Sequence, residues 1–136
     1  MVGSLFTEMR GVFVANLTPF HSDGSVNVEA YLDHVAWLSE KGVKGLVPLG
    51  TNGEGPSLSL REKLLLLERL FARGLPLQVV PAAMEGSLPA TLEMIRAVND
   101  LPAAGILVLP PYYYKPVTVE GLRRFFEAVL EVSRHP

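Results

Sequence analysis

The chain has 136 residues, of which 49% are hydrophobic and 19% charged, and its formal net charge is −2. This length suits one domain and excludes a complete barrel enzyme, which needs about 250 residues. The hydrophobic content is enough for a sizeable core, so we do not expect a disordered chain. The 12 basic and 14 acidic residues nearly balance, which argues against a nucleic-acid partner and against a charged membrane surface.

The residue types also narrow the possible chemistry and location. The sequence contains no cysteine, which excludes disulfides, thiolate zinc ligands and a cysteine nucleophile. The histidines are scattered without a second ligand at metal-binding spacing, so we expect no metal site. Residues 1–10 lack the apolar core of a signal peptide, and no window reaches the roughly 18 uninterrupted apolar residues of a membrane span. A soluble, cytoplasmic protein is therefore expected.

The first half of the chain indicates two strand–helix pairs. Residues 11–17 form a short apolar run typical of a strand, and apolar residues then recur at helical spacing until Gly42, a helix C-terminal cap signal. Residues 43–49 predict the second strand. Ser59 and Glu62 have the spacing of a capping box, which predicts the start of a leucine-rich second helix.

The second half repeats this alternation twice. Residues 77–82 predict a third strand, and Ser87 opens a third helix with one apolar face. Residues 104–109 predict a fourth strand. Thr118 can cap a last helix, whose apolar residues repeat at i, i+3, i+4, i+7 and i+8.

The predicted strands are apolar almost throughout, which is typical of a parallel sheet covered by helices. Four such units predict an α/β fold in a single domain over residues 1–136, with no linker. Both a doubly wound sheet and part of a (β/α)8 barrel fit this pattern. In either architecture, ligands bind in the loops at the carboxyl ends of the strands.

One such loop, residues 50–57 (GTNGEGPS), is hereafter called the glycine loop. Its glycines let backbone N–H groups approach a small anion, and Thr51 and Asn52 add polar side chains that could hold a carboxylate. The glycine spacing fits neither a P-loop nor a dinucleotide fingerprint. A merely structural turn remains an alternative, in which Glu54 would hold backbone N–H groups rather than perform acid–base chemistry.

A second loop, residues 110–118, is hereafter called the tyrosine loop and contains three consecutive phenols, Tyr112, Tyr113 and Tyr114. Packing around a rigid turn explains such a cluster, and a proton relay is the functional alternative. Lys115 could form a Schiff base only with a depressed pKa, and its place in this loop predicts a solvated amine instead. The other lysines are predicted at helix ends or strand starts, away from these loops: Lys41, Lys44 and Lys63.

Four stretches together resemble the N-terminal half of the dihydrodipicolinate synthase / N-acetylneuraminate lyase family of pyruvate-handling aldolases. They are LTPF (17–20), DGSVN (23–27), GVKGLVPLGTNGEGPSLSLREK (42–63) and PPYYYKP (110–116), and they cover nearly the whole chain. The resemblance implies a (β/α)8 (TIM) barrel, of which this chain would form four of eight units, a half-barrel. It also implies a lysine Schiff base with pyruvate or another small 2-oxo acid, without metal or organic cofactor. Because a half-barrel leaves open strand edges and apolar faces, we expect either a homo-oligomer or a chain that is the ordered part of something longer.

The resemblance also assigns roles to individual residues. Thr51 corresponds to the hydroxyl of the catalytic proton relay. Asn52, with Gly50 and Gly53, corresponds to the segment that binds the pyruvate carboxylate. Tyr113 corresponds to the tyrosine that completes the relay, which in dihydrodipicolinate synthases reaches into the site of the neighbouring subunit.

The chain departs from the family pattern at Asn52, where Ser or Thr is frequent, and at Tyr114, where the synthase branch has asparagine. The acceptor aldehyde therefore stays open. The Schiff-base lysine, the second relay tyrosine and the substrate arginine lie on later strands, beyond Pro136, so we expect the fragment alone to be an inactive lyase. The alternative is a non-catalytic α/β module that binds a small carboxylate or supports assembly.

Overall fold

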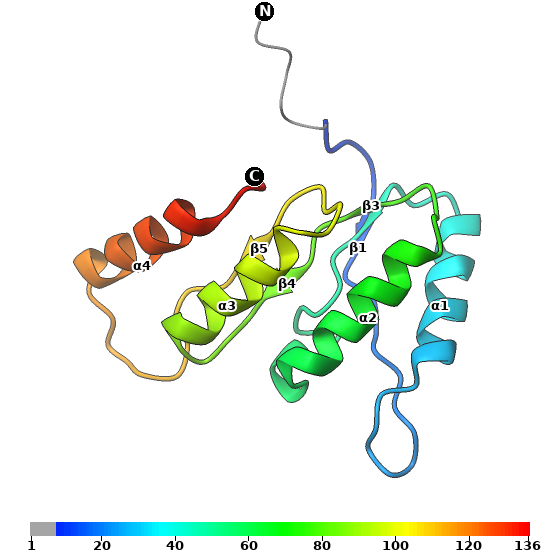
Figure 1. Cartoon of the computed structure of the whole chain (residues 1–136), viewed down its shortest axis with the longest axis horizontal. Coiled ribbons are helices and arrows are strands. Elements are labelled where there is room, and N and C mark those ends of the chain that lie inside the picture. The colour runs from blue at the N-terminus through cyan, green and yellow to red at the C-terminus, as the bar shows by residue number, and fades with distance from the viewer. Residues whose placement is uncertain (1–7) are drawn as a thin grey trace, which may run out of the picture.

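The computed structural model describes residues 8–136. Over this range helices and short strands alternate along the chain, as Figure 1 shows. The elements are β1 (Phe13–Val14), α1 (Val28–Glu40), β2 (Gly45–Leu46), the 3₁₀ turn Gly55–Ser57, α2 (Leu60–Ala72), β3 (Gln78–Val79), β4 (Ala82–Ala83), α3 (Leu88–Val98), β5 (Leu107–Val108) and α4 (Val119–Val132).

The strands are parallel and follow one another in chain order. β1 pairs with β2, β2 pairs with β3, and β4 pairs with β5. β3 and β4 belong to one extended segment, because the Ala82 N–H donates to the Pro48 carbonyl on one side and the Leu107 N–H donates to the Pro81 carbonyl on the other. The predicted arrangement of four sequential parallel strands is therefore confirmed.

The paired ladders are shorter than the apolar runs that predict them. Pro48 follows β2 and Pro81 separates β3 from β4, and proline has no N–H to donate to a neighbouring strand. Leu49 adopts a left-handed backbone with φ of +66°, which turns the chain away from the sheet. Sequence periodicity therefore locates the strands correctly but overestimates the length over which they pair.

The helix boundaries follow the predicted capping residues. The Ser59 hydroxyl accepts from the Glu62 N–H while the Glu62 carboxylate accepts from the Ser59 N–H, so the capping box is present. Ser87 and Thr118 cap α3 and α4 through their side-chain oxygens. Gly42 has φ of +79° just beyond α1, as expected of a C-terminal cap.

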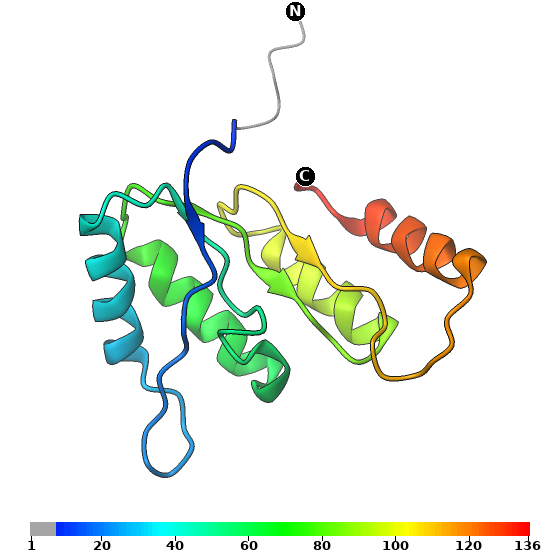
Figure 2. The ribbon, with the colours of Figure 1, turned by 180° about the vertical axis from the view of Figure 1, so that it is seen from behind.

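Helices α1, α2 and α3 cover one face of the strands, and α4 lies beside α3 (Figures 1 and 2). The other face, towards the viewer in Figure 2, carries no helix among residues 8–136. The core lies between the strands and the covering helices, and its fully buried members include Tyr31, Val35, Leu46, Leu66, Leu67, Met94 and Ile95.

The bare face of the sheet exposes apolar side chains. Beyond the end of β1, Asn16 and Thr18 are buried, whereas Leu17 between them is 58% exposed and lines a cleft with Ala30 and His34 of α1. Leu107 of β5 is 48% exposed. This face has the apolar character of a surface that another part of a barrel would cover.

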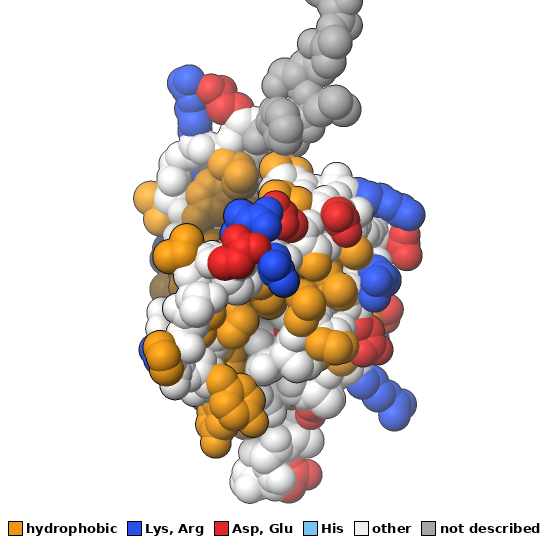
Figure 3. Space-filling view, turned by 90° about the vertical axis from the view of Figure 1, so that its left-hand side faces the viewer, with side chains coloured by type: hydrophobic (Ala, Val, Ile, Leu, Met, Phe, Trp, Pro, Cys, Tyr) orange, Lys and Arg blue, Asp and Glu red, His pale blue; other side chains and the backbone are white. Residues whose placement is uncertain are grey.

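The α4 side of the molecule combines apolar and charged groups (Figure 3). On α4, Glu120 pairs with Arg123 and Arg124, and these hydrogen bonds hold the pKa of Glu120 below its usual range. Val119 and Leu130 are 84% and 74% exposed. None of the helices in residues 8–136 combines the length and apolarity that crossing a bilayer requires.

Candidate functional site

The carboxyl ends of the strands meet along the lower edge of the molecule in Figure 1. The loop before α1, the glycine loop, the loop after β4 and the tyrosine loop all lie along this edge. Parallel strands bring these loops together although they are far apart in sequence. The residues singled out from the sequence therefore share one edge of the sheet.

The glycine loop is held by bonds from within and from outside. The Gly55 N–H donates to the Gly50 carbonyl and the Glu54 N–H donates to the Thr51 carbonyl, each at 3.1 Å. From the loop after β1, the Thr18 hydroxyl donates to the Gly53 carbonyl at 2.7 Å, and this bond is buried. The loop is therefore a compact turn with a fixed backbone.

Close packing explains why glycine and an unusual backbone occur in this loop. A Cβ at Gly55 would lie 1.8 Å from the carbonyl oxygen of Leu49, so no larger residue fits. Leu49 itself is fully buried with φ of +66°, a conformation that costs a side chain of this kind about 1–2 kcal/mol. Backbone strain of this kind is concentrated at functional sites, where the surrounding structure maintains it.

The glycine loop contains three successive N–H groups without an acceptor among the described residues, of which those of Thr51 and Asn52 belong to exposed residues and that of Gly53 to a buried one. Three successive N–H groups beside a hydroxyl and an amide suit a small anion such as a carboxylate. Among residues 8–136 the Glu54 side chain makes no hydrogen bond that caps the 3₁₀ turn, which is the structural role that the sequence left open.

Asn52 and Glu54 also line a cleft of about 400 Å³ that extends towards α1. Its other walls come from the loop after β1, including Thr18 and Pro19, and from His34 of α1. Asn52 therefore faces an open cleft rather than a packed interface between helices.

The tyrosine loop is much more exposed. Tyr112, Tyr113 and Tyr114 are 39%, 76% and 80% exposed, and the rings of Tyr113 and Tyr114 meet edge to face at 5.0 Å. The peptide bond between Lys115 and Pro116 is cis. No hydrogen bond within residues 8–136 joins Tyr113 to Thr51 or Asn52, so the structure places the two loops on the same edge without a hydrogen bond between these residues.

Lys63 lies at a helix end, near the start of α2, as the sequence predicts, but the prediction that it lies away from the candidate loops is wrong. It is 1% exposed, and its Nζ lies 2.5 Å from Oε1 of Glu85 in the loop after β4, on the same edge as the candidate site. A sequence signal for its burial exists, because Lys63 precedes Leu66, Leu67 and Leu70 at i+3, i+4 and i+7 on the apolar face of α2. Lys41, Lys44 and Lys115 are exposed.

A buried polar pair lies between the first strand and α1, and sequence reasoning missed it. Tyr31 is fully buried, and loss of solvation raises the pKa of its phenol to about 12. Neither its hydroxyl nor the Asn16 Oδ1 atom has a hydrogen-bond partner among the described residues. A phenol with this pKa is neutral at physiological pH.

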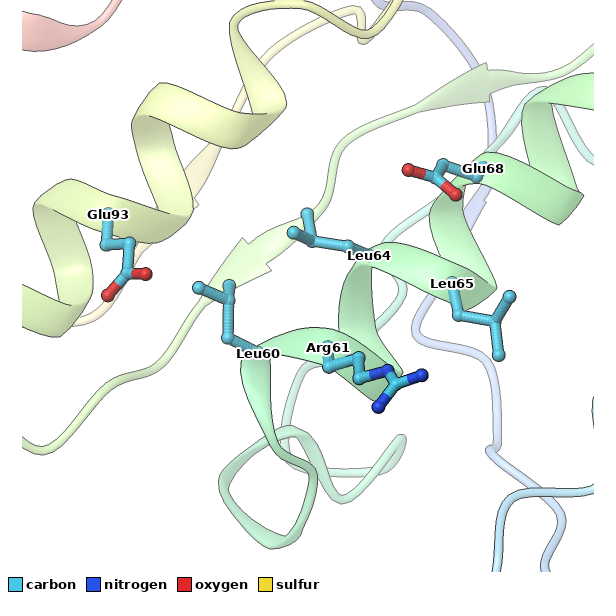
Figure 4. Close-up of a pocket in the computed structure, with 6 residues that line it drawn as sticks. All are labelled: Leu60, Arg61, Leu64, Leu65, Glu68 and Glu93. Carbon is cyan, nitrogen blue, oxygen red and sulfur yellow. The ribbon is translucent and has the colours of Figure 1, made fainter.

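A further groove of about 610 Å³ runs between α2 and α3 (Figure 4). Leu60 and Leu64 point into it from α2, and Glu93 of α3 stands on its far side. It opens in the helix layer, on the side of the sheet opposite the bare face. Its lining offers no nucleophile, and residues 8–136 contain no cluster of His, Asp and Glu side chains fit for a metal ion.

Comparison with known proteins identifies the family. Residues 8–136 match the model of the Dihydrodipicolinate synthetase family. The chain belongs to this family. It is 39% identical over 123 residues to the 4-hydroxy-tetrahydrodipicolinate synthase of Methanococcus vannielii. This alignment covers 89% of this chain and 42% of that enzyme.

Solved structures of the family share the fold. The Proteus mirabilis N-acetylneuraminate lyase matches with a TM-score of 0.85 and 30% identity, over 93% of this chain and 43% of the lyase. A pyruvate complex of a Sulfolobus solfataricus 2-keto-3-deoxygluconate aldolase variant matches with a TM-score of 0.86 and 29% identity, over the same shares of the two chains. The chain thus spans about two fifths of its relatives' length, and its four βα units form part of a TIM barrel.

Proposed function

We propose that this chain forms the carboxylate-binding and proton-relay half of a Schiff-base aldolase site for pyruvate or another small 2-oxo acid. The observation that carries the proposal is the glycine loop at the carboxyl edge of β2, in which the N–H groups of Thr51, Asn52 and Gly53 donate to no acceptor among residues 8–136. Such a cradle favours a carboxylate through several short hydrogen bonds from fixed donors.

Each residue has a distinct role in this proposal. The backbone from Gly50 to Gly53 and the Asn52 amide bind the carboxylate of the substrate. A lysine amine adds to the ketone carbon, the carbonyl oxygen leaves as water, and an imine forms. The hydroxyls of Thr51 and Tyr113 pass the protons that this exchange requires, as general acid–base groups do.

The amine is not supplied by the lysines of this chain. Lys41, Lys44 and Lys115 are exposed outside the strands, and Lys63 is engaged by Glu85. In the proposal, the reacting lysine therefore belongs to a part of the barrel outside these 136 residues.

The relatives support the substrate class and leave the acceptor open. The Sulfolobus aldolase variant was solved as a pyruvate complex, and the related solved structures include an N-acetylneuraminate lyase. These two relatives are named for different activities, a lyase of N-acetylneuraminate and an aldolase of 2-keto-3-deoxygluconate. We therefore propose a 2-oxo acid as the common substrate and assign no aldehyde partner.

Borohydride trapping tests the proposal. The 136-residue chain is incubated with pyruvate and borohydride, alone and together with the C-terminal part of the Methanococcus vannielii synthase, and intact masses are measured. We expect no reduced pyruvyl adduct on the chain alone and an adduct on the added part. A stoichiometric adduct on this chain would show that one of its own lysines reacts.

Assembly is part of the same proposal. The bare sheet face and the exposed Tyr113, Tyr114 and Leu130 are apolar surfaces that favour association, so we propose a homo-oligomer. Sedimentation of the purified chain checks this. An assembly larger than one chain is expected, and a stable monomer would contradict it.

A further inference from the structure

The ion pair between Lys63 and Glu85 differs from every other ion pair in residues 8–136. Its side chains are 1% and 15% exposed, whereas both partners of every other pair are more than half exposed. An exposed pair such as Arg69–Glu29 contributes little to stability because water and salt screen it. The buried pair is therefore the one whose loss has structural consequences.

Stability alone does not explain why a lysine stands at position 63. Burying two charges is costly, and a well-packed apolar replacement of such a pair is often neutral or stabilising. Lys63 lies on the face of α2 that otherwise buries Leu66, Leu67 and Leu70, so an apolar residue there would continue the core. Unlike an apolar contact, the ion pair is directional, because a short hydrogen bond fixes the relative position of the two groups that it joins.

The pair lies in a series of contacts between neighbouring loops at the carboxyl edge. The Thr18 hydroxyl joins the first loop to the glycine loop. Lys63 is the fourth residue of α2, which begins three residues after the end of the glycine loop, and it is joined to Glu85 in the third loop. The next residue, Gly86, borders the tyrosine loop, because a Cβ added there would lie 3.9 Å from the Tyr112 hydroxyl oxygen.

We infer that Lys63 and Glu85 are positioning residues, which fix the glycine loop relative to the loops after β4 and β5. They do not touch the substrate. They fix the position of the start of α2 relative to the tyrosine loop. The N–H groups of Thr51 and Asn52 therefore keep a fixed position relative to Tyr113. This role rests on the proposed function, since it names the site that the pair positions.

The test separates position from stability in the 136-residue chain. The variants are Glu85→Gln, Lys63→Met and the double variant Lys63→Met with Glu85→Leu. Arg69→Met is the matched control, because it removes an exposed ion pair from the same helix. Each protein is measured for its unfolding midpoint, for its pyruvate Kd and for the amide NMR signals of residues 50–53.

Both single variants should unfold earlier and bind pyruvate about 10- to 100-fold more weakly, the range expected when a supporting group misplaces a site. The double variant should recover its unfolding midpoint while its Kd stays raised and its loop signals stay displaced. The control should match the parent in all three measurements. Recovery of the Kd and the loop signals together with the midpoint would overturn the inference, because the pair would then supply stability alone.

The same variants also interpret two further results, a single variant that does not fold and a parent chain that does not bind pyruvate. If a single variant does not fold, the double variant, which leaves no charge unpaired, still allows its unfolding midpoint to be compared with its pyruvate Kd and loop signals. If the parent does not bind pyruvate, the proposed function fails. The amide signals of the parent and the double variant then decide the positioning role by themselves: displaced signals support it and coincident signals overturn it.

Discussion

The glycine loop and the tyrosine loop lie on the same edge but are built in opposite ways. The glycine loop is closed by its own backbone bonds, tied to Thr18, and packed so tightly that Gly55 admits no Cβ. The tyrosine loop extends into solvent, with Tyr113 and Tyr114 mostly exposed.

This difference suggests how the proposed site is divided. A loop that must bind a small carboxylate gains from rigid donors, because donors fixed in advance need no reorganisation when the ligand arrives. The exposed phenols of the tyrosine loop have no comparable support within residues 8–136. We therefore expect the carboxylate cradle to form within this chain and the tyrosine to take up its working position against another polypeptide.

The largest effect is expected at Gly55. A Cβ there would lie 1.8 Å from the Leu49 carbonyl oxygen, so Gly55→Ala should destabilise the chain by about 3 kcal/mol or prevent folding. The nearest atom to a Cβ at Gly86 would be 3.9 Å away. Gly86→Ala is therefore the control and should change stability by less than about 0.5 kcal/mol. Denaturant unfolding compares the two, and equal effects would contradict the tight packing of the glycine loop.

The next largest effect on stability comes from replacing a threonine with valine, at either of two positions in or beside the glycine loop. Thr18→Val removes a buried hydroxyl that donates to Gly53, and should cost about 1–2 kcal/mol and speed amide exchange in residues 50–55. Thr51→Val removes an exposed hydroxyl and should change stability by less than about 0.5 kcal/mol. In the chain mixed with the C-terminal part of the Methanococcus vannielii synthase, hereafter the complemented enzyme, Thr51→Val should instead slow Schiff-base formation. An unchanged rate would remove Thr51 from the relay.

The two helices that follow these loops give a smaller contrast. Ser59 caps α2 in a reciprocal box, whereas Thr118 caps α4 by a single bond. Ser59→Ala should cost about 1 kcal/mol and Thr118→Ala about half as much. Chemical unfolding of both variants checks the order, and a larger loss at Thr118 would reverse the comparison.

The contribution of the box should also depend on pH. Hydrogen bonds from the Ser59 hydroxyl and N–H lower the pKa of Glu62 below its usual value. A carboxyl whose folded-state pKa is depressed stabilises the fold above its ordinary pKa and loses that contribution as pH falls through the folded pKa. The cost of Ser59→Ala should therefore shrink in acid. A cost that is constant from neutral pH to below the folded pKa would contradict this account.

The smallest effect on stability is expected in the tyrosine loop. Tyr113→Phe removes an exposed hydroxyl without a bond in the described chain, so the unfolding free energy should change by less than about 0.5 kcal/mol. In the complemented enzyme, Schiff-base formation should become slower if the phenol relays protons. An unchanged rate of Schiff-base formation would show that Tyr113 does not take part in the proton relay.

Local patterns predicted much of this fold because they act over a few residues. The box at Ser59 and the cap at Gly42 were predictable from spacing, and the apolar runs located the strands. Strand length was not predictable, because pairing depends on the neighbouring strand and on where Pro48 and Pro81 withhold a donor.

The site was predictable only where one loop carries it. The anion-binding role that we propose for residues 50–53 was inferred from glycines and short polar side chains that are adjacent in sequence. The pairing of Lys63 with Glu85 joins residues 22 positions apart and depends on how α2 packs beside the loop after β4. The burial of Lys63 was recoverable from the leucines three, four and seven residues later, whereas its partner was not.

The most direct test of the account is a pyruvate titration of the 136-residue chain followed by amide-resolved NMR. The account predicts saturable shifts of the Thr51, Asn52 and Gly53 amide signals, with the signals of Tyr113 and Tyr114 unchanged in the isolated chain. Absence of binding at residues 50–53, or shifts centred on the tyrosine loop, would contradict the claim that this chain carries the carboxylate-binding half of the site.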